Sequence, residues 1–171
     1  LIDPYANLIS GALKSVPEIF GHQAVDEIGN GDLGKKDLRD SAPYVPFSVV
    51  TEITKSQINR PRIPWNKTII YEAHVKGLTF RNLEIPESDR GTYRALSHPT
   101  VIAHLQKLGV TTLELLPIHH YLTETSVSSR GRINHWGYNP IAFSAPHAAY
   151  GATDNPIREL QEAISILHEA G

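Results

Sequence analysis

The clearest hydrophobic pattern along the chain lies in its second half. Residues 68–75, Thr-Ile-Ile-Tyr-Glu-Ala-His-Val, are rich in β-branched and aromatic residues, and residues 110–118 are almost continuously apolar. The first composition is typical of a buried strand, and a continuous apolar run is typical of a strand in a parallel sheet. We therefore predict two strands at these positions.

Each predicted strand is followed by a helical pattern. Pro99 suits the first turn of one helix, which Ser97 or His98 would cap. Asn155 is a suitable N-cap for a second helix, which ends before Gly171. Apolar residues recur at helical spacing at Val101, Ile102, Leu105 and Leu108, and again at Ile157, Leu160, Ala163, Ile164 and Leu167. The alternation of strand and helix predicts an α/β fold of parallel β/α units with right-handed crossovers.

Two long connections follow the predicted strands. Residues 76–98 and 119–155 leave the carboxyl ends of these strands, where β/α folds carry their chemistry. The second connection is longer than a simple link needs, so we expect one long functional loop there. Two strands do not make a stable sheet alone, and residues 67–171 would supply about a quarter of the units of a (β/α)8 barrel.

The first half, residues 1–66, has no comparable periodicity. Glycines and prolines concentrate in residues 21–46, residues 47–50 predict a short strand, and residues 55–66 are typical of a linker. This half lacks the apolar pattern for a core of its own. We therefore expect it to pack on another part of the protein.

Charge and cysteine content lower the expectation for several functions. Sixteen Lys and Arg residues against 18 Asp and Glu residues give a net charge of −2, so no overall positive field would attract nucleic acid or an anionic membrane. The absence of cysteine excludes disulfides, thiolate metal sites and cysteine nucleophiles. No apolar run approaches the roughly 20 residues of a membrane-spanning helix, and no signal peptide opens the chain. A soluble cytoplasmic protein is expected.

Two patterns that could indicate ligand binding have simpler explanations. Residues 29–34 fit G-x-G-x-x-G, but no buried strand before them or helix after them is predicted, so a glycine-rich loop is favoured. Three of the nine histidines, His74, His119 and His147, could gather around a metal ion. No H-E-x-x-H helical spacing is present, however, and structural roles, or roles in supporting other site residues, are favoured for them.

Glu72 and Glu114 lie within the two predicted apolar strands. A buried carboxylate needs a partner, so the two side chains are either a catalytic acid pair or structural charges satisfied by neighbouring donors. We favour the structural interpretation, in which both side chains are buried.

Residues 134–140, Asn-His-Trp-Gly-Tyr-Asn-Pro, are the richest candidate site. Sugars present flat apolar C–H faces ringed by hydroxyl groups, so stacking aromatic rings together with hydrogen-bonding amides suit them. The alternative interpretation is an aromatic corner that only packs the loop.

Four motifs resemble the α-amylase superfamily, in that superfamily's order. They are residues 71–79 (YEAHVKGLT), 91–93 (GTY), 113–119 (LELLPIH) and 136–140 (WGYNP). The nearest match is the glycogen debranching and isoamylase branch, which residues 1–6 and 40–43 also resemble. The resemblance covers nearly the whole chain.

The resemblance implies an N-terminal β-sandwich domain, a (β/α)8 TIM barrel and a C-terminal β-domain. Residues 1–66 would be the exit of the β-sandwich domain and a linker, and residues 67–171 would be the first two units of an incomplete barrel. The superfamily's nucleophile and acid/base carboxylates lie on later strands, beyond Gly171. We therefore expect a truncated, inactive chain without catalytic residues, and the absence of methionine even at position 1 agrees with truncation.

The resemblance also implies an activity, which is hydrolysis of α-1,6-glucosidic branch linkages in glycogen by a retaining mechanism. We expect no cofactor and assign no metal ligand. Tyr138 matches the family tyrosine that stacks on the sugar next to the scissile bond, while Trp136, His135 and Asn134 would shape the pocket. The expected partner is glycogen or a branched maltooligosaccharide. Exposed barrel surface would favour self-association.

Three alternatives stay open. The aromatic patch could belong to a non-enzymatic carbohydrate-binding module. The chain could come from another superfamily member, such as a branching enzyme or a trehalohydrolase, which share the Tyr-Glu-x-His core of residues 71–74. A small flavodoxin-like protein that binds an anion would need a phosphate-cradling loop at a strand end, and residues 29–34 are in the wrong context for one.

Overall fold

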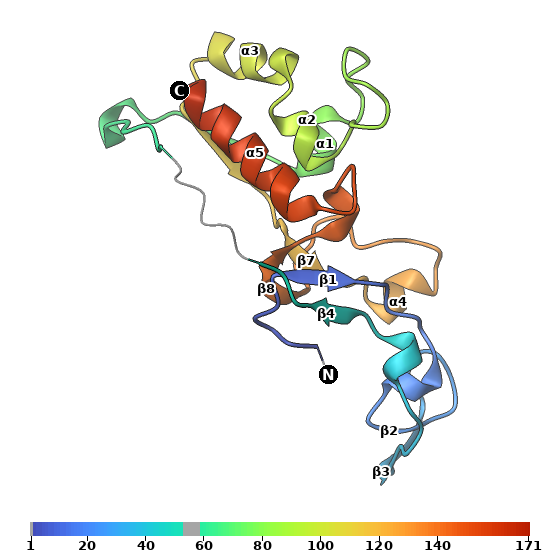
Figure 1. The fold of residues 1–171 in the computed structure, drawn as a ribbon. Coiled ribbons are helices and arrows are strands. Elements are labelled where there is room, and N and C mark those ends of the chain that lie inside the picture. Colours follow the sequence, from blue (N-terminus) through green and yellow to red (C-terminus); the bar gives the residue numbers. More distant parts are fainter. Residues whose placement is uncertain (1, 53–58) are drawn as a thin grey trace.

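The computed structural model describes residues 2–52 and 59–171 (Figure 1). Within these residues, eight short strands form four two-stranded sheets. Helices α3 (Pro99–Lys107) and α5 (Pro156–Glu169) lie at one end of the molecule, and the hairpin of β2 (His22–Ala24) and β3 (Gly31–Lys36) lies at the other (Figure 1).

The two strands predicted in the second half form a parallel pair. β5 (Ile70–Ala73) lies beside β6 (Thr112–Leu115). The chain passes from β5 to β6 through α1 (Val75–Thr79), α2 (Tyr93–Leu96) and α3, and it reaches α5 after β6. The predicted alternation of strand and helix is therefore confirmed.

The predicted helix starts are confirmed by their capping hydrogen bonds. Nδ1 of His98 accepts a hydrogen bond from the Thr100 backbone N–H at 3.4 Å and caps α3. The side-chain oxygen of Asn155 accepts from the Arg158 N–H at 3.1 Å and caps α5. Each side chain satisfies a backbone donor that has no partner inside its helix, which favours a helix start at that residue.

The expectation of one long loop at residues 119–155 is wrong. β7 (His119–Tyr121) pairs antiparallel with β8 (Pro140–Pro146), α4 (Thr125–Ser128) lies between them, and the 3-10 turn η4 (Ala148–Tyr150) follows β8. The register between β7 and β8 shifts twice. Such irregular pairing lacks the even alternation of apolar and polar residues that identifies a strand in sequence.

The first half packs against this hairpin, as its sparse apolar pattern predicts. β1 (Leu8–Ser10) pairs antiparallel with β4 (Phe47–Val49), and β4 confirms the short strand predicted at residues 47–50. Together with β8, this part of the chain forms a small buried cluster. Its members are Ala6, Ile9, Ala142 and Ala145.

Two further buried clusters lie around the parallel pair. The first consists of Val75, Tyr93, Leu96, Tyr121, Tyr150 and Ala163, and the second of Ile85, Ala95, Val101 and Leu105. Tyr71 of β5 and Leu113 of β6 pack against the second cluster. One face of the parallel pair is therefore covered by the helices that connect its strands.

The other face of the parallel pair is open, which corrects the expectation for its two glutamates. Glu72 and Glu114 lie opposite each other in the register, and both are exposed rather than buried. Ile70 shares their face and is 52% exposed. Sequence suggested burial because strands of this composition are usually covered on both faces.

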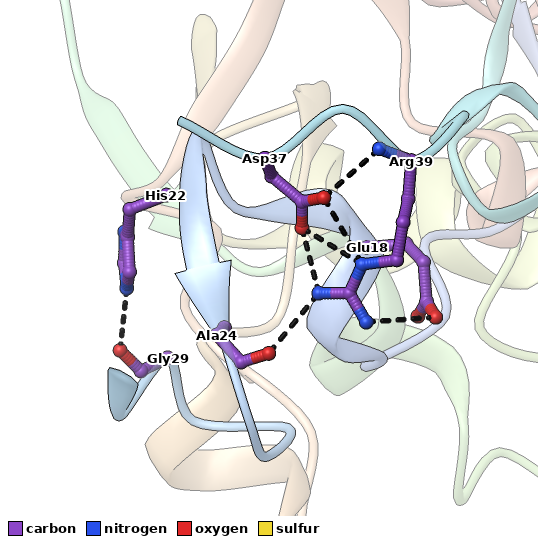
Figure 2. Close-up of polar contacts among 6 residues, drawn as sticks. All are labelled: Glu18, His22, Ala24, Gly29, Asp37 and Arg39. Atoms are coloured by element: carbon purple, nitrogen blue, oxygen red, sulfur yellow. Dashed lines mark hydrogen bonds and ion pairs between the residues drawn. The ribbon is translucent and has the colours of Figure 1, made fainter. Parts of the chain in front are cut away.

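The glycine-rich residues 29–34 form part of the β2–β3 hairpin. Gly29 has a φ of +86°, and its carbonyl oxygen lies 2.8 Å from Nε2 of His22 (Figure 2). Residues 31–34 belong to β3, so the predicted loop is wrong for them. The next element after β3 is the short 3-10 turn η2 (Ala42–Tyr44) rather than a helix, which excludes a dinucleotide-binding turn.

A polar cluster holds the base of this hairpin (Figure 2). Arg39 donates to the Asp37 carboxylate at 2.6 Å and to the Glu18 carboxylate at 3.2 Å. It also donates to the backbone oxygen of Ala24 at 3.0 Å. The hydrogen bond from Arg39 lowers the pKa of Asp37 to about 2, so this carboxylate is ionised at neutral pH.

Leu1 and residues 53–58 lie outside the described residues, so the predicted linker at 55–66 is described only from residue 59. None of the described helices is long and apolar enough to cross a membrane. The domain division between residues 66 and 67, and self-association of the chain, stay predictions.

Candidate functional site

The segment Asn134–Tyr138, called the aromatic loop below, is organised by the side chain of Asn134. The Asn134 side-chain oxygen accepts hydrogen bonds from the backbone N–H groups of Trp136 at 3.1 Å and Gly137 at 3.0 Å. Its Nδ2 donates to the Leu122 carbonyl and to Glu124, each at 3.3 Å. Because the oxygen and the nitrogen of its amide both make hydrogen bonds, the Asn134 side chain fixes the backbone of the loop.

Gly137 places this loop directly against Tyr121 of β7. Gly137 is buried and has a φ of +78°, a conformation that strains residues with a side chain. A Cβ atom at this position would lie 2.9 Å from the Tyr121 ring. Glycine is therefore needed both for the backbone conformation and for the close approach.

The rings of Trp136 and Tyr138 remain accessible, with 57% and 70% of these residues exposed. The His135 ring contacts Trp136 edge-on, at 5.0 Å between centroids and 77° between planes. Exposed aromatic faces held by a fixed backbone are suitable surfaces for stacking on a sugar ring.

His74, at the carboxyl end of β5, packs against His135 of the aromatic loop. Its ring stacks on the His135 ring at 4.3 Å and 9°, and its Nε2 lies 2.7 Å from the His135 carbonyl oxygen. Its Nδ1 accepts from the Gly77 N–H at 3.1 Å, which caps α1. His74 thus joins the parallel pair to the aromatic loop.

Two buried tyrosines complete this support. The Tyr150 hydroxyl lies 3.0 Å from Nε2 of His74 and 3.1 Å from the Tyr121 hydroxyl. His147 stacks on Tyr121 with ring centroids 3.7 Å apart. Sequence reasoning did not select Tyr121 or Tyr150, because no recognisable spacing links them to residues 134–138.

Burial keeps these groups neutral at physiological pH. It lowers the pKa of His74, and it lowers the pKa of His147 to about 4, with a smaller contribution from the charge of His120. Burial likewise raises the pKa of Tyr150, reinforced by its hydrogen bond with Tyr121. The contacts beneath the aromatic loop are therefore made by uncharged imidazole and phenol groups.

A cavity of about 420 Å³ lies beside the loop. Its lining includes His74, Lys76, Arg81, Tyr121, Asn134, His135, His147 and Tyr150. A larger hollow of about 1030 Å³ lies between residues 7–8 and α5, away from these aromatic rings. We place the candidate site at the smaller cavity, because Asn134 and His135 of the aromatic loop line it together with polar side chains from other elements.

The structure separates the three histidines that could have formed a metal site. His74 and His147 both contact Tyr150, whereas His119 packs against Phe143 at 5.7 Å. Within residues 2–52 and 59–171, no group of three or more His, Asp or Glu side chains is placed to hold a metal ion. The structural role favoured for His74 is confirmed by its capping bond and its contact with His135.

Comparison with solved structures gives the class of protein. A type I pullulanase from Bacillus subtilis, solved with maltose, matches 72% of this chain and 19% of its own, with a TM-score of 0.58 and 26% identity. A pullulanase from Anoxybacillus, solved with maltotetraose, shares the fold over 99% of this chain and 22% of its own, with a TM-score of 0.58 and 22% identity. The chain thus has the fold of part of a pullulanase-type enzyme of the α-amylase family.

Sequence comparison gives particular relatives. The chain is 42% identical over 174 aligned positions to the glycogen debranching enzymes of Salmonella typhi and Salmonella typhimurium. The alignments cover all of this chain and 25% of each enzyme, so the chain spans about a quarter of their length. No protein-family model matches the chain. It is therefore a homologue of glycogen debranching enzymes along its whole length, which confirms the resemblance of its motifs.

Proposed function

We propose that the protein to which this chain belongs hydrolyses α-1,6-glucosidic branch linkages in glycogen or a related α-glucan. The 42% identity to glycogen debranching enzymes over the whole chain carries the proposal. The pullulanase fold neighbours support it, since two of them were solved with maltose or maltotetraose. We further propose that the protein acts in the cytoplasm, and that residues 67–171 are the first two units of a (β/α)8 barrel.

Tyr138 and Trp136 are proposed to bind the glucan. Their exposed rings lie on the connection after β6, and His135 of the same loop stacks on His74 at the carboxyl end of β5. Loops at this end of parallel strands carry the active sites of β/α barrels. In this proposal Tyr138 stacks on the sugar next to the scissile bond, and Trp136, His135 and Asn134 shape the pocket.

The catalytic carboxylates are proposed to come from a part of the protein outside these 171 residues. Retaining glycosidases need two carboxyl groups about 5–5.5 Å apart, one as nucleophile and one as acid/base. Glu72 and Glu114 are neighbours, but they lie within the strands on the open face and not on the aromatic loop. The 171-residue chain alone is accordingly expected to be inactive.

The test is hydrolysis of a branched glucan by the intact protein, followed as release of linear chains. Wild type should cleave α-1,6 linkages, and Tyr138→Ala should lower kcat/KM about tenfold or more through loss of ring stacking. Tyr5→Ala, which removes an 82% exposed ring from the N-terminal part, is the control and should change little. Glu72→Gln and Glu114→Gln should also retain activity. Cleavage of α-1,4 linkages alone, or formation of new branches, would contradict the proposal.

A carbohydrate-binding module is the second candidate, favoured by the exposed rings of Trp136 and Tyr138. It would bind maltotetraose without cleaving any linkage. Titration of the 171-residue chain with maltotetraose separates the two proposals. Tight, saturable binding by the chain, together with no hydrolysis by the intact protein, favours the module.

A further inference from the structure

The aromatic loop is held at two points by rings from different elements. At His135, the His74 ring stacks on the imidazole and contacts the backbone carbonyl. At Gly137, the Tyr121 ring lies so close that a Cβ atom would come within 2.9 Å of it. The spacing of His74 and Tyr121 therefore determines where both sides of the loop lie.

The Tyr150 hydroxyl joins these two rings. It is within hydrogen-bond distance of Nε2 of His74, at 3.0 Å, and of the Tyr121 hydroxyl, at 3.1 Å. All three residues are more than nine-tenths buried. Losing either bond therefore leaves a largely buried polar group without its partner.

The direction of these hydrogen bonds follows from the partners of His74. The Gly77 backbone N–H can only donate, so Nδ1 of His74 accepts and carries no proton. Nε2 of the neutral ring then carries the proton, which it shares between the His135 carbonyl at 2.7 Å and the Tyr150 oxygen at 3.0 Å in a bifurcated hydrogen bond. The Tyr150 hydroxyl then donates its own hydrogen bond to the Tyr121 hydroxyl. One defined tautomer thus fixes the whole arrangement.

We propose that Tyr150 is a positioning residue for glucan binding, because its hydroxyl sets the spacing of His74 and Tyr121 and thereby fixes the aromatic loop that presents Trp136 and Tyr138. In this role Tyr150 acts through its contacts with His74 and Tyr121. This inference rests on the proposed glucan-binding role of the loop, but the order of the loop is measurable without any substrate.

The first test compares Tyr150→Phe with Tyr93→Phe in the intact protein. Both substitutions keep a buried ring in the same cluster and remove one hydroxyl. The Tyr93 hydroxyl donates to the Ile118 carbonyl at 3.0 Å and belongs to no bond of the His74 arrangement. Amide hydrogen exchange at Trp136 and Gly137 should accelerate about tenfold in Tyr150→Phe and less than about twofold in Tyr93→Phe. Equal exchange in the two variants would overturn the proposal.

The second test measures hydrolysis of a branched maltooligosaccharide by the same proteins. Tyr150→Phe should raise KM about fivefold and leave kcat within about twofold, since ordering the loop is then part of binding. Tyr93→Phe should leave KM near the wild-type value. An unchanged KM in Tyr150→Phe overturns the positioning role, whereas a wild-type protein that cleaves no α-1,6 linkage refutes the proposed function and leaves the exchange result decisive.

His74→Asn provides an independent variant if Tyr150→Phe does not fold. Asparagine is a good N-cap and can still accept from the Gly77 N–H, but it lacks Nε2 and the stacking ring. Exchange should accelerate at Trp136 and Gly137 while the Gly77 amide stays protected. Faster exchange at Gly77 alone, with an unchanged loop, would overturn the proposal.

Discussion

In the C-terminal part of the chain, residues 59–171, the parallel strands lie against clusters of fully buried side chains. Tyr93, Leu96 and Val75 are at most 1% exposed. In the N-terminal part, residues 2–52, every residue of β3 is exposed, including Leu33 at 80%, and Leu38 beyond the strand is 84% exposed. The short strands in the two parts are therefore stabilised by different interactions.

Hydrogen bonds to charged groups replace apolar burial in the N-terminal hairpin. The Asp26 carboxylate accepts from the backbone N–H groups of Ile28 and Asn30 and from the Asn30 side chain, which together lower its pKa. Arg39 joins Asp37, Glu18 and a backbone carbonyl at the base. A segment with little to bury can still adopt a defined turn, since such local bonds fix its backbone.

The largest difference between the two parts should appear when one leucine in each is truncated. Leu96→Ala should lower the free energy of unfolding by about 3 kcal/mol, because it leaves a cavity in the first buried cluster. Leu33→Ala in β3 should cost less than about 0.5 kcal/mol, because the side chain is already in water. Denaturant unfolding of the intact protein measures both values. Similar losses would show that the hairpin is buried in the intact protein.

Close packing in the C-terminal part should also appear at its glycines. Gly137→Ala should lower the free energy of unfolding about 2 kcal/mol more than Gly131→Ala does. Both glycines have positive φ values, +78° and +65°, so the backbone strain is matched. A Cβ atom at Gly131 meets nothing within 4 Å, whereas at Gly137 it meets the Tyr121 ring. Thermal unfolding measures both values. Equal losses of unfolding free energy in the two variants would mean that the Tyr121 ring moves aside for the new methyl group without cost.

The two parts should respond to acid in different pH ranges. The pKa of His147 is about 4 in the folded protein, below its usual 6.5, so the unfolded chain takes up the proton first as pH falls. Stability from this residue is fully present above pH 6.5 and is lost between pH 6.5 and 4, by an amount on the order of 2 kcal/mol.

His147→Phe keeps a ring against Tyr121 and removes the titrating group, so it is the matched variant for this pH effect. Its unfolding free energy should vary less between pH 7 and 4 than that of wild type. His74 and His120 also have a lowered pKa, so some dependence on pH should remain. Identical pH profiles for variant and wild type would contradict the assignment to His147.

The smallest effect is expected at the hairpin base. Arg39→Met should accelerate amide exchange in residues 22–36 about threefold and barely change the melting temperature, because the Arg39 side chain is 43% exposed and ion pairs made by such a side chain stabilise weakly. The pKa of Asp37 is lowered to about 2, so its contribution persists above pH 3.8 and is lost as pH falls through 2. Arg158→Met breaks the exposed pair with Glu162 on α5 and should leave hairpin exchange unchanged. Faster exchange in both variants would point to a general charge effect.

Local sequence signals were sufficient for the β/α elements. Pro99 and Asn155 mark helix starts that capping bonds confirm, and the apolar run at residues 110–118 contains β6. Local signals did not identify β7 and β8, whose pairing shifts register. They also gave the wrong burial for Glu72 and Glu114, which lie on an open face of the parallel pair. Burial depends on what covers a strand, and the pattern of one strand does not contain that information.

By itself, the sequence determined the order of strands and helices, the aromatic segment at residues 134–138 and the homology to glycogen debranching enzymes. These are properties of neighbouring residues or of motifs that alignment can read. The tertiary structure alone brought His74, Tyr121 and Tyr150 together beneath that segment, from positions up to 76 residues apart. Such contacts arise because the folded chain buries rings from separate elements in one cluster, where each hydroxyl and imidazole must find a partner.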